Sequence, residues 1–382
     1  MQRTIFIKKS LDTTEKLSIL SQHSQYDLAC ACGTKDDEHR RRSKEDKWIY
    51  PVALPNGGTT FLFKTLLSNE CVNDCKYCPL RATKEQKRCR LQPEELAKTF
   101  LDYYRSRKVS GIFLSSGVIG KPDITMSLIN QAARLLRRMN FKGYMHLKVI
   151  PGSSEAAIRE TVSLASAVSL NIEVPGEENF KALCQGKNYQ KDIIESIKFI
   201  SKLRKETPRY SNVKQTTQFV VGAYNETDKD IVKNSWQLYK ESSLSRVYFS
   251  AYQRGLGEPD IPGEHSPRTN ADLLTREHRL YQLDWLIRKY GFSVDEFVFE
   301  KDGNLSLAND PKEVWAASHP EFFPVNINQD GRERLLRVPG LGEVAVGKIL
   351  NFRQGGRKIR SLDELGKMNK RIKKAEKYIR FS

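Results

Sequence analysis

The sequence lacks any run of about 20 apolar residues, the length that a helix needs to cross a bilayer. Its first residues, Met1 to Thr4, are not followed by the apolar segment of a secretory signal. Its seven cysteines are an odd number, which does not favour a framework of paired disulfides. We therefore expect a cytoplasmic protein in a reducing compartment, with no membrane span.

Acidic residues are scarce relative to basic ones, and the formal net charge is +18. The excess is uneven, because residues 331–382 hold fifteen Lys and Arg against five Asp and Glu, a net charge of +10. Shorter basic clusters occur at residues 39–44 and 81–90. Such clusters are often solvated surface, but three of one sign favour a polyanionic partner, most simply a nucleic acid.

Three cysteines with short spacing, Cys71, Cys75 and Cys78, form the most informative motif. Thiolates are the usual ligands of iron-sulfur clusters, and three of them leave one iron of a 4Fe-4S cluster open to another ligand. Cys89 could instead complete a four-cysteine zinc site, although zinc sites more often pair two closely spaced cysteine units. A non-catalytic zinc protein that binds DNA is therefore the non-enzymatic alternative.

The motif, with Tyr77 just before its last cysteine, resembles the signature of the radical SAM superfamily. The resemblance implies that the open iron binds S-adenosylmethionine, whose reductive cleavage gives a 5′-deoxyadenosyl radical. It also implies an electron donor, which the sequence does not identify. In such an enzyme the cofactor carries the radical chemistry and the protein positions it.

Strand and helix patterns alternate from about Thr59 onward, which is typical of a parallel sheet with helical crossovers. We predict strands at 61–67, 111–116, 144–150, 167–174, 216–222 and 246–252. We predict helices at 15–27, 94–107, 124–139, 154–165, 193–204 and 228–241. This is an α/β fold, a partial (β/α)6 TIM-like barrel of the radical SAM type.

Apolar and polar residues alternate within the predicted strands, as Met145, Leu147 and Val149 do with His146 and Lys148. Side chains change face at every strand residue, so one face of each strand is apolar and the other polar. We interpret the polar face as the lining of a barrel lumen. The alternative is an ordinary half-exposed sheet, which the intervening helices make less attractive.

Ligands of parallel α/β sheets bind at the carboxyl ends of the strands, and the cysteines follow the first of these strands. The resemblance to the superfamily implies cofactor contacts from other strand ends. Together with Tyr77, the implied contacts lie at three strand ends and are Ser115, Ser116, Gly117, Asn171, Glu173 and Gly222. The segment before Gly222 has Gln218 where the superfamily pattern has glycine, which departs from that pattern.

Four residues on the polar strand faces are candidates for catalysis. Lys148 and His146 could transfer protons or bind substrate, and Glu173 is a plausible partner for Lys148. Tyr248 and Tyr252 could stack on a base or relay a hydrogen atom. For each tyrosine the alternative is an amphipathic core residue whose hydroxyl is hydrogen bonded within the protein.

The segment from Arg332 to Leu350 resembles a helix-hairpin-helix motif. A tight glycine turn can bring backbone N-H groups to a phosphate at the start of the second helix. The nucleic-acid contacts that we predict from it are Val338, Gly340, Gly342, Lys348 and Arg353. A degenerate second copy at 361–379 lacks the glycine pair, so we expect it to complete an all-α domain rather than to bind. A hairpin that binds protein is the alternative.

Taken together, the cysteines, the hairpin and segments such as Phe113–Gly117 and His146–Gly152 resemble a family of radical SAM proteins described as DNA modification or repair proteins. That resemblance implies DNA as target and a uracil-DNA glycosylase-like protein as partner. An RNA-modifying enzyme and a repair lyase of the spore-photoproduct type are alternatives. Cys30 and Cys32 could join Cys89 in an auxiliary cluster, although closely spaced cysteines are more often buried.

We expect four regions along the chain. They are an N-terminal extension (1–56), a radical SAM partial barrel (57–255), a connecting extension (256–330) and a helix-hairpin-helix domain that binds DNA (331–382).

Overall fold

The computed structural model describes residues 11–24, 48–54, 57–366 and 370–382. The chain forms two compact units, one of residues 1–226 and 237–273 and the other of residues 227–236 and 274–382. These limits are not those of the predicted regions, since the second unit extends well upstream of residue 331. The basic segment at 39–44 lies outside the described residues. So do Cys30 and Cys32, the two cysteines considered for an auxiliary metal cluster.

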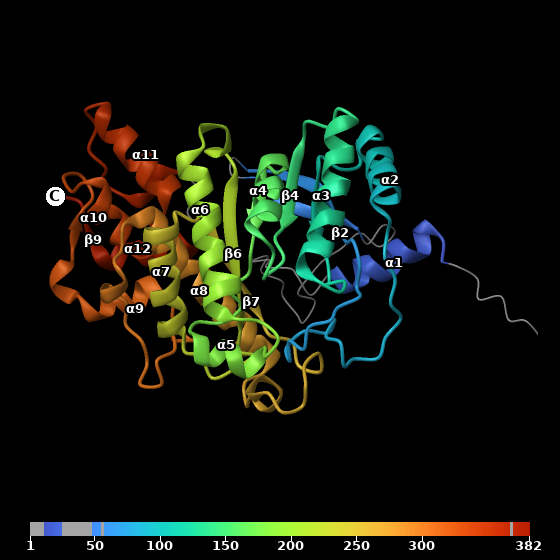
Figure 1. The fold of residues 1–382 in the computed structure, drawn as a ribbon. Helices are drawn as coiled ribbons and strands as arrows, with labels where there is room; N and C mark the ends of the chain where they lie inside the picture. Colours follow the sequence, from blue (N-terminus) through green and yellow to red (C-terminus); the bar gives the residue numbers. More distant parts are fainter. Residues whose placement is uncertain (1–10, 25–47, 55–56, 367–369) are drawn as a thin grey trace, which may run out of the picture. The chain divides into compact units, whose positions relative to one another are not determined.

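A seven-stranded sheet forms the first unit, with its strands in sequence order (Figure 1). The strands are β1 (Ile49–Ala53), β2 (Thr59–Leu66), β3 (Gly111–Ser115), β4 (Tyr144–Lys148), β5 (Ala167–Ser169), β6 (Lys214–Val221) and β7 (Arg246–Ala251). The six predicted strands are β2 to β7, and all of them are parallel. Strand β1, which the sequence did not predict, pairs with β2 in the antiparallel direction.

Helices connect the parallel strands, and those that lie wholly in the first unit cover the outer face of the sheet (Figure 1). They are α2 (Pro93–Arg105), α3 (Pro122–Arg138), α4 (Glu155–Leu164), α5 (Glu177–Leu183), the π-helical η2 (Tyr189–Glu195), α6 (Ser196–Glu206) and α7 (Asp228–Ser242). Local sequence starts several of them: Gln92 and Glu95 form a capping box at α2, and the Ser154 hydroxyl accepts from the Ala157 N-H at α4. The N-terminal helix α1 (Thr13–Ser24) begins two residues before its predicted start.

The predicted alternation along the strands is confirmed. Met145 and Leu147 of β4 are fully buried in the apolar core, whereas His146 between them faces the other side of the sheet. His146, Ser169 and Gln218 are nevertheless also buried. A half-exposed sheet would leave such polar residues in solvent, so the polar face lines an enclosed lumen.

The second unit is built mainly of short helices. It contains most of α8 (Asn270–Tyr290), then α9 (Pro311–Ser318), α10 (Arg332–Arg337), α11 (Glu343–Gln354) and α12 (Lys370–Ala375). Single turns of 3-10 helix lie between them, η5 (Val294–Glu296), η6 (Pro320–Phe322), η7 (Leu362–Leu365) and η8 (Glu376–Tyr378). The predicted all-α composition is wrong in one respect, because β8 (Val325–Asn326) and β9 (Ile379–Arg380) form a short parallel pair.

Two tight turns organise the C-terminal part of this unit. The first joins α10 to α11, and Gly340 in it has a φ of 89°, a value that suits glycine. The second follows η7, where Gly366 has a φ of 103°. Both segments share one apolar core that includes Leu335, Val346 and Leu362. Among the described residues, no helix combines the length and apolar character needed to cross a membrane.

Candidate active site

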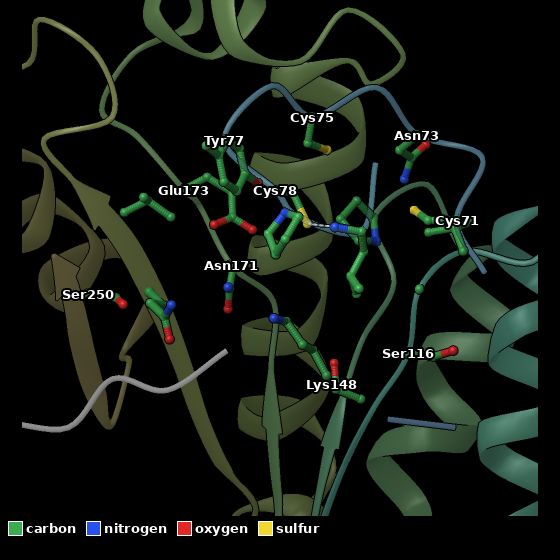
Figure 2. Close-up of a pocket in the computed structure, with 18 of the residues that line it drawn as sticks. Cys71, Asn73, Cys75, Tyr77, Cys78, Ser116, Lys148, Asn171, Glu173 and Ser250 are labelled. Atoms are coloured by element: carbon green, nitrogen blue, oxygen red, sulfur yellow. Dashed lines mark hydrogen bonds between the residues drawn. The ribbon is translucent and has the colours of Figure 1, made fainter. Parts of the chain in front are cut away.

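A cavity lies at the carboxyl ends of the parallel strands and contains all three motif cysteines (Figure 2). Figure 2 shows the side chains of Lys148, Asn171 and Glu173 directed toward the space beside Cys78. Residues at or just after the ends of six strands, β2 to β7, line it, namely Leu66, Ser115, Ser116, Gly117, Lys148, Asn171, Glu173, Gln218, Val220, Ser250 and Ala251. Adjacent parallel strands end at one edge, which is why residues far apart in sequence meet here.

The loop that carries the cysteines is fixed by backbone hydrogen bonds on both sides. The Val72 N-H donates to the Val118 carbonyl at 3.0 Å, and the Lys76 N-H donates to the Leu183 carbonyl at 2.8 Å. The Lys76 carbonyl in turn accepts from the Glu258 N-H at 2.7 Å. Segments after β3, α5 and β7 therefore hold the cysteine loop over the strand ends.

Gly117 is required by this packing. A Cβ atom at residue 117 would lie 2.2 Å from the Glu70 carbonyl oxygen and 3.3 Å from the Cys71 side chain. The Gly117 N-H donates to the Ser68 carbonyl at 2.8 Å, which keeps the segment after β3 against the cysteine loop. The sequence predicted Gly117 as a cofactor contact; it lines the cavity, and it also lets two backbone segments approach.

Two arginines of the basic segment 81–90 bind backbone carbonyls. Arg88 donates to the carbonyls of Leu80, Arg81 and Lys84 at 2.8–2.9 Å and also to that of Asn69. Arg81, which is buried, donates to the carbonyls of Cys78, Leu256 and Gly257 and pairs with Glu258. These guanidinium groups shape the cysteine loop, so they do not form the exposed basic surface that the charge pattern suggested.

Cys75 has an environment unlike that of the other two cysteines. Its sulfur lies 3.3 Å from the sulfur of Cys184 and 3.1 Å from Nζ of Lys187. The hydrogen bond from Cys184, together with the Lys187 charge, lowers the pKa of the Cys75 thiol to about 5, although burial acts in the opposite direction. Burial, and then the Cys75 charge, raise the pKa of Cys78 to about 12. The surroundings of Cys75 therefore favour its thiolate form more than those of Cys78 do.

Tyr77 and Glu173 lie together in the cavity wall. Burial, with a further contribution from the Glu173 carboxylate, raises the pKa of Tyr77 well above its usual range, so its hydroxyl stays protonated. Glu173 has a φ of 67°, which is unusual for a residue with a side chain. Its N-H donates to the Gln218 carbonyl and its carbonyl accepts from Val220 N-H, so this conformation is held by β6.

The match to a known family agrees with this geometry. A model of the radical SAM superfamily matches residues 65–234, from the end of β2 into α7. The chain contains a radical SAM domain. Such domains belong to enzymes that use a 4Fe-4S cluster and S-adenosylmethionine, and the curled sheet is their partial barrel, as predicted.

Similar solved structures are also found. The FeFe-hydrogenase maturase HydG from Carboxydothermus hydrogenoformans is 16% identical with a TM-score of 0.43, over 59% of this chain and 51% of that one. SuiB from Streptococcus suis is 12% identical with a TM-score of 0.44, over 60% and 48%. Methylornithine synthase is 14% identical with a TM-score of 0.41, over 58% and 63%. The chain spans about half the length of the HydG and SuiB structures. No curated protein matches it.

The donor set of the radical SAM domain fits its cluster. Cys71, Cys75 and Cys78 line one cavity and could supply three sulfur ligands there, with no fourth cysteine among the described lining residues. Cys89 lies off the cavity, its sulfur 4.0 Å from the Lys16 carbonyl oxygen. In the part of the chain that the structure describes, no three His, Cys, Asp or Glu residues gather closely enough to share one metal ion. A cluster does not require that closeness, because each thiolate binds a different iron.

Other predicted site residues divide into those at the cavity and those elsewhere. Lys148 and Tyr252 line the cavity, whereas Gly222, His146 and Tyr248 are not among its described lining residues. The Gly222 N-H donates to the Glu226 carboxylate in the turn after β6. His146 lies on β4 below Lys148, where its ring packs 4.3 Å from that of Phe113. Tyr248 lies on β7, the last strand of the sheet, and the Arg246 guanidinium lies 4.9 Å from the centre of its ring.

The hydroxyl of Tyr252 is used within the protein. It donates to the Glu264 carboxylate and accepts from the Gly257 N-H at 2.8 Å. Glu264 also accepts from the N-H groups of Gly255 and Gly257. Tyr252 thereby fixes the loop after β7, the same loop that contacts Lys76. This is the alternative to a catalytic role, namely an amphipathic residue whose hydroxyl is hydrogen bonded within the protein.

Sequence reasoning missed several residues of the site. The Cys184 sulfur contacts that of Cys75, and Lys187 and His23 line the cavity. Lys187 follows α5 in a turn, and His23 comes from α1 and contacts Asn69. The only signal in the sequence was a cysteine three residues before a lysine, after a strand end, which carries no motif.

The predicted nucleic-acid contacts are placed differently from the cavity residues. Val338 is fully buried in the core of the second unit. Lys348 donates from Nζ to the Leu365 carbonyl at 3.0 Å, and Arg353 donates to the carbonyls of Asp330 and Gln329. Gly340 and Gly342 lie in the turn before α11, where their backbone is partly exposed.

Proposed function

We propose that the protein is a radical SAM enzyme that modifies or repairs a nucleic acid, with DNA as the polymer. The observation that carries the proposal is the pairing of a three-cysteine cavity in one unit with a basic, two-turn segment in the other. Residues 331–382 have a net charge of +10, and phosphate contacts are the main source of sequence-independent affinity for nucleic acids.

In the cavity, Cys71, Cys75 and Cys78 would hold the cluster, and the strand-end residues from Ser115 to Glu173 would hold S-adenosylmethionine. When bound, the reduced cluster supplies the electron that cleaves the cofactor to a 5′-deoxyadenosyl radical. The chain's own residues orient the cofactor and exclude water. Lys148, directed into the cavity from β4, is the group best placed to bind substrate or move a proton.

The turn before α11 supports phosphate binding. Gly342 caps this 12-residue helix, and no side chain within the described residues caps its first N-H groups. Such N-H groups and the helix dipole favour an anion. Glu343 in the first turn would oppose an anion, but Arg332 pairs with it at 2.6 Å.

Basic residues near this segment divide into those that donate to backbone carbonyls and those for which the structure shows no such bond among the described residues. Lys348 and Arg353 bind carbonyls, so we assign them to support of the fold rather than to direct contact. Arg357, Lys358 and Arg360, in the loop after α11, are exposed. We propose that this basic loop and the backbone of the Gly340–Gly342 turn contact phosphates.

A salt titration of DNA binding tests this assignment. The triple variant Arg357→Gln, Lys358→Gln, Arg360→Gln removes three exposed charges from one loop. The slope of log affinity against log salt is negative, and each lost phosphate contact should make it less steep by about 0.9. Fluorescence anisotropy with a labelled duplex measures it. The matched control neutralises three exposed lysines of the first unit, Lys98, Lys142 and Lys198, and should keep the slope. Equal slopes in wild type and loop variant would reject the basic loop as a DNA site.

Catalysis is tested separately with anaerobically reconstituted full-length protein. We expect formation of 5′-deoxyadenosine with dithionite, loss of iron in Cys71→Ala, Cys75→Ala and Cys78→Ala, and retention of iron in Cys89→Ala. Deuterium transfer from labelled DNA to 5′-deoxyadenosine would support DNA as substrate. Transfer from RNA alone would move the proposal to RNA modification, and reversal of thymine photoproducts would define a lyase. Addition of a uracil-DNA glycosylase-like protein tests that proposed partner by co-elution.

A further inference from the structure

Cys75 is surrounded by two side chains that have no counterpart at the other motif cysteines among the described contacts. Lys187 donates from Nζ to the Cys75 sulfur at 3.1 Å, and the Cys184 sulfur lies 3.3 Å from the same atom. Both Cys75 and Cys184 are buried. The Cys78 sulfur instead accepts from the Leu80 backbone N-H at 3.4 Å. One of the three thiolates is therefore placed beside a positive charge inside the protein.

This arrangement is built by the backbone rather than by a chance contact of a flexible lysine. Cys184 ends α5, with its N-H donating to the Phe180 carbonyl at 2.8 Å. Asp74, next to Cys75, accepts from the Gly186 N-H at 3.1 Å, and the Leu183 carbonyl accepts from Lys76. Residues 183–187 are thus joined to the cysteine loop on both sides of Cys75, which fixes where the Lys187 side chain begins.

A cluster becomes more negative when it gains an electron, and its thiolate sulfurs carry part of that charge. A hydrogen bond or a positive charge at a ligand sulfur therefore stabilises the reduced state more than the oxidised state. Hydrogen bonds with a charged donor are roughly twice as strong as neutral ones. Removal of the Lys187 ammonium should make the cluster harder to reduce.

We propose that Lys187, supported by Cys184, raises the reduction potential of the cluster through its hydrogen bond to the Cys75 thiolate. The inference rests on the proposed cluster ligands and goes beyond them, because neither residue is a ligand. Lys187 acts through Cys75, so it is a positioning residue for the electron transfer that starts the reaction.

Lys187 also lines the cavity, and an ammonium there could bind the carboxylate of S-adenosylmethionine instead. The two roles differ in what they change. Tuning through Cys75 alters the reduction potential in the absence of S-adenosylmethionine. Binding of a carboxylate alters the affinity for S-adenosylmethionine and leaves that potential unchanged.

The test compares full-length Lys187→Met and Lys187→Gln with wild type after anaerobic cluster reconstitution. Iron content and the EPR spectrum of the reduced cluster show whether it has assembled, and an EPR-monitored redox titration without S-adenosylmethionine gives the potential. We expect the reduction equilibrium to become about tenfold less favourable, which is about 59 mV for one electron. Cys184→Ala should shift it in the same direction by less. Lys191→Met, an exposed lysine of the same segment, should leave it unchanged.

Lys187→Arg keeps the charge and should retain most of the wild-type potential. An unchanged potential in both neutral variants overturns the proposal, and if their affinity for S-adenosylmethionine falls at the same time, Lys187 binds the cofactor. Loss of iron in Cys184→Ala would also contradict it, because Cys184 would then be a ligand. These outcomes are independent of DNA binding, so failure here is distinguishable from failure of the proposed nucleic-acid function. Wild type that assembles no cluster would overturn both.

Discussion

Basic side chains serve both the cavity of the first unit and the glycine turns of the second, but in different ways. At the cavity, Arg88 donates hydrogen bonds to four carbonyls of the cysteine loop, and Lys187 donates to the Cys75 sulfur. At the turns, two lysines each bind one carbonyl: Lys312 reaches Leu341, just before Gly342, and Lys348 reaches Leu365, just before Gly366. In both regions these basic side chains hold nearby loop or turn segments in place.

The two regions differ in which groups remain available to bind a ligand. The cavity presents side chains, the three thiols and the polar strand ends, in a buried space. The turns present backbone, while charge is carried by exposed residues such as Lys358 and Arg360. A local excess of charge therefore suggests a region for an anionic partner, but it does not identify which residues would make the contacts.

The largest effect that we expect comes from Gly117→Ala at the cavity. The added methyl would meet the Glu70 carbonyl oxygen at 2.2 Å, and backbone hydrogen bonds from Gly117 to Ser68 and from Val72 to Val118 hold the two segments together. Overpacking of this kind typically costs about 1–3 kcal/mol, and more where backbone must move. We expect lower stability in chemical denaturation and lower iron content after reconstitution. Wild-type values for both would show that the cysteine loop is not held by this contact.

The next effect concerns Arg88→Ala, which removes one guanidinium from four carbonyls of the cysteine loop. Carbonyls that lose their donors cost about 1–3 kcal/mol where they are not rehydrated. We expect a loss of about 3 kcal/mol in the free energy of unfolding, with faster proteolysis within residues 69–88. Arg90→Ala, an exposed neighbour, is the control and should change stability by less than about 0.5 kcal/mol. Similar effects for the two variants would mean that the carbonyl contacts contribute little.

The cavity of the first unit shows which features the sequence could predict. The spacing of Cys71, Cys75 and Cys78, and the rule that parallel strands end at one edge, predicted a site that the structure brings together. The alternating strands predicted a polar lumen for the same reason, since side-chain direction follows from strand periodicity. Each of these predictions uses short-range geometry that the chain itself fixes.

Contacts that depend on how distant segments pack could not be predicted. Cys184 lies 109 positions from Cys75, and nothing in its flanking sequence gives the position of α5 over the cysteine loop. Arg81 and Lys348 look like surface charges in the sequence, because a basic residue that binds carbonyls has the same letter as one that binds phosphate. Strand β1 was missed because Pro51 lies within it and proline is confined to sheet edges.

A smaller effect, dependent on pH, is expected at the turn of the second unit. Burial lowers the pKa of Lys312 to about 7, although Asp310 acts in the opposite direction. Below pH 7 the folded and unfolded states both carry the proton, and stability does not change with this group. Between about pH 7 and the ordinary lysine pKa near 10.4, the folded state releases the proton first, so stability rises with pH by up to about 1.4 kcal/mol per unit.

Lys312→Met removes that dependence and leaves the Leu341 carbonyl without its donor. We therefore expect the stability of wild type relative to the variant to increase between pH 7 and 9, measured by calorimetry. Lys374→Met is the control, because this exposed lysine pairs with Glu313 at the surface. A difference between wild type and Lys312→Met that stays constant with pH would show that Lys312 remains charged in its buried site.

The smallest effect that we expect comes from Gly347→Ala in the second unit, which makes the same change of glycine to alanine as Gly117→Ala does at the cavity. Gly347 lies within α11, and a Cβ added there would have no neighbour within 4 Å outside its own helix. Glycine in a helix interior costs about 0.8–1.0 kcal/mol relative to alanine. Gly347→Ala should therefore stabilise the protein by up to that amount, the opposite sign from Gly117→Ala, when both are measured by chemical denaturation. Affinity for DNA should stay at the wild-type value, because the helix start at Gly342 is unchanged. If Gly347→Ala weakened binding without loss of stability, α11 itself would lie closer to the phosphates than the turn and the basic loop, and the proposed contact surface would have to include its exposed face.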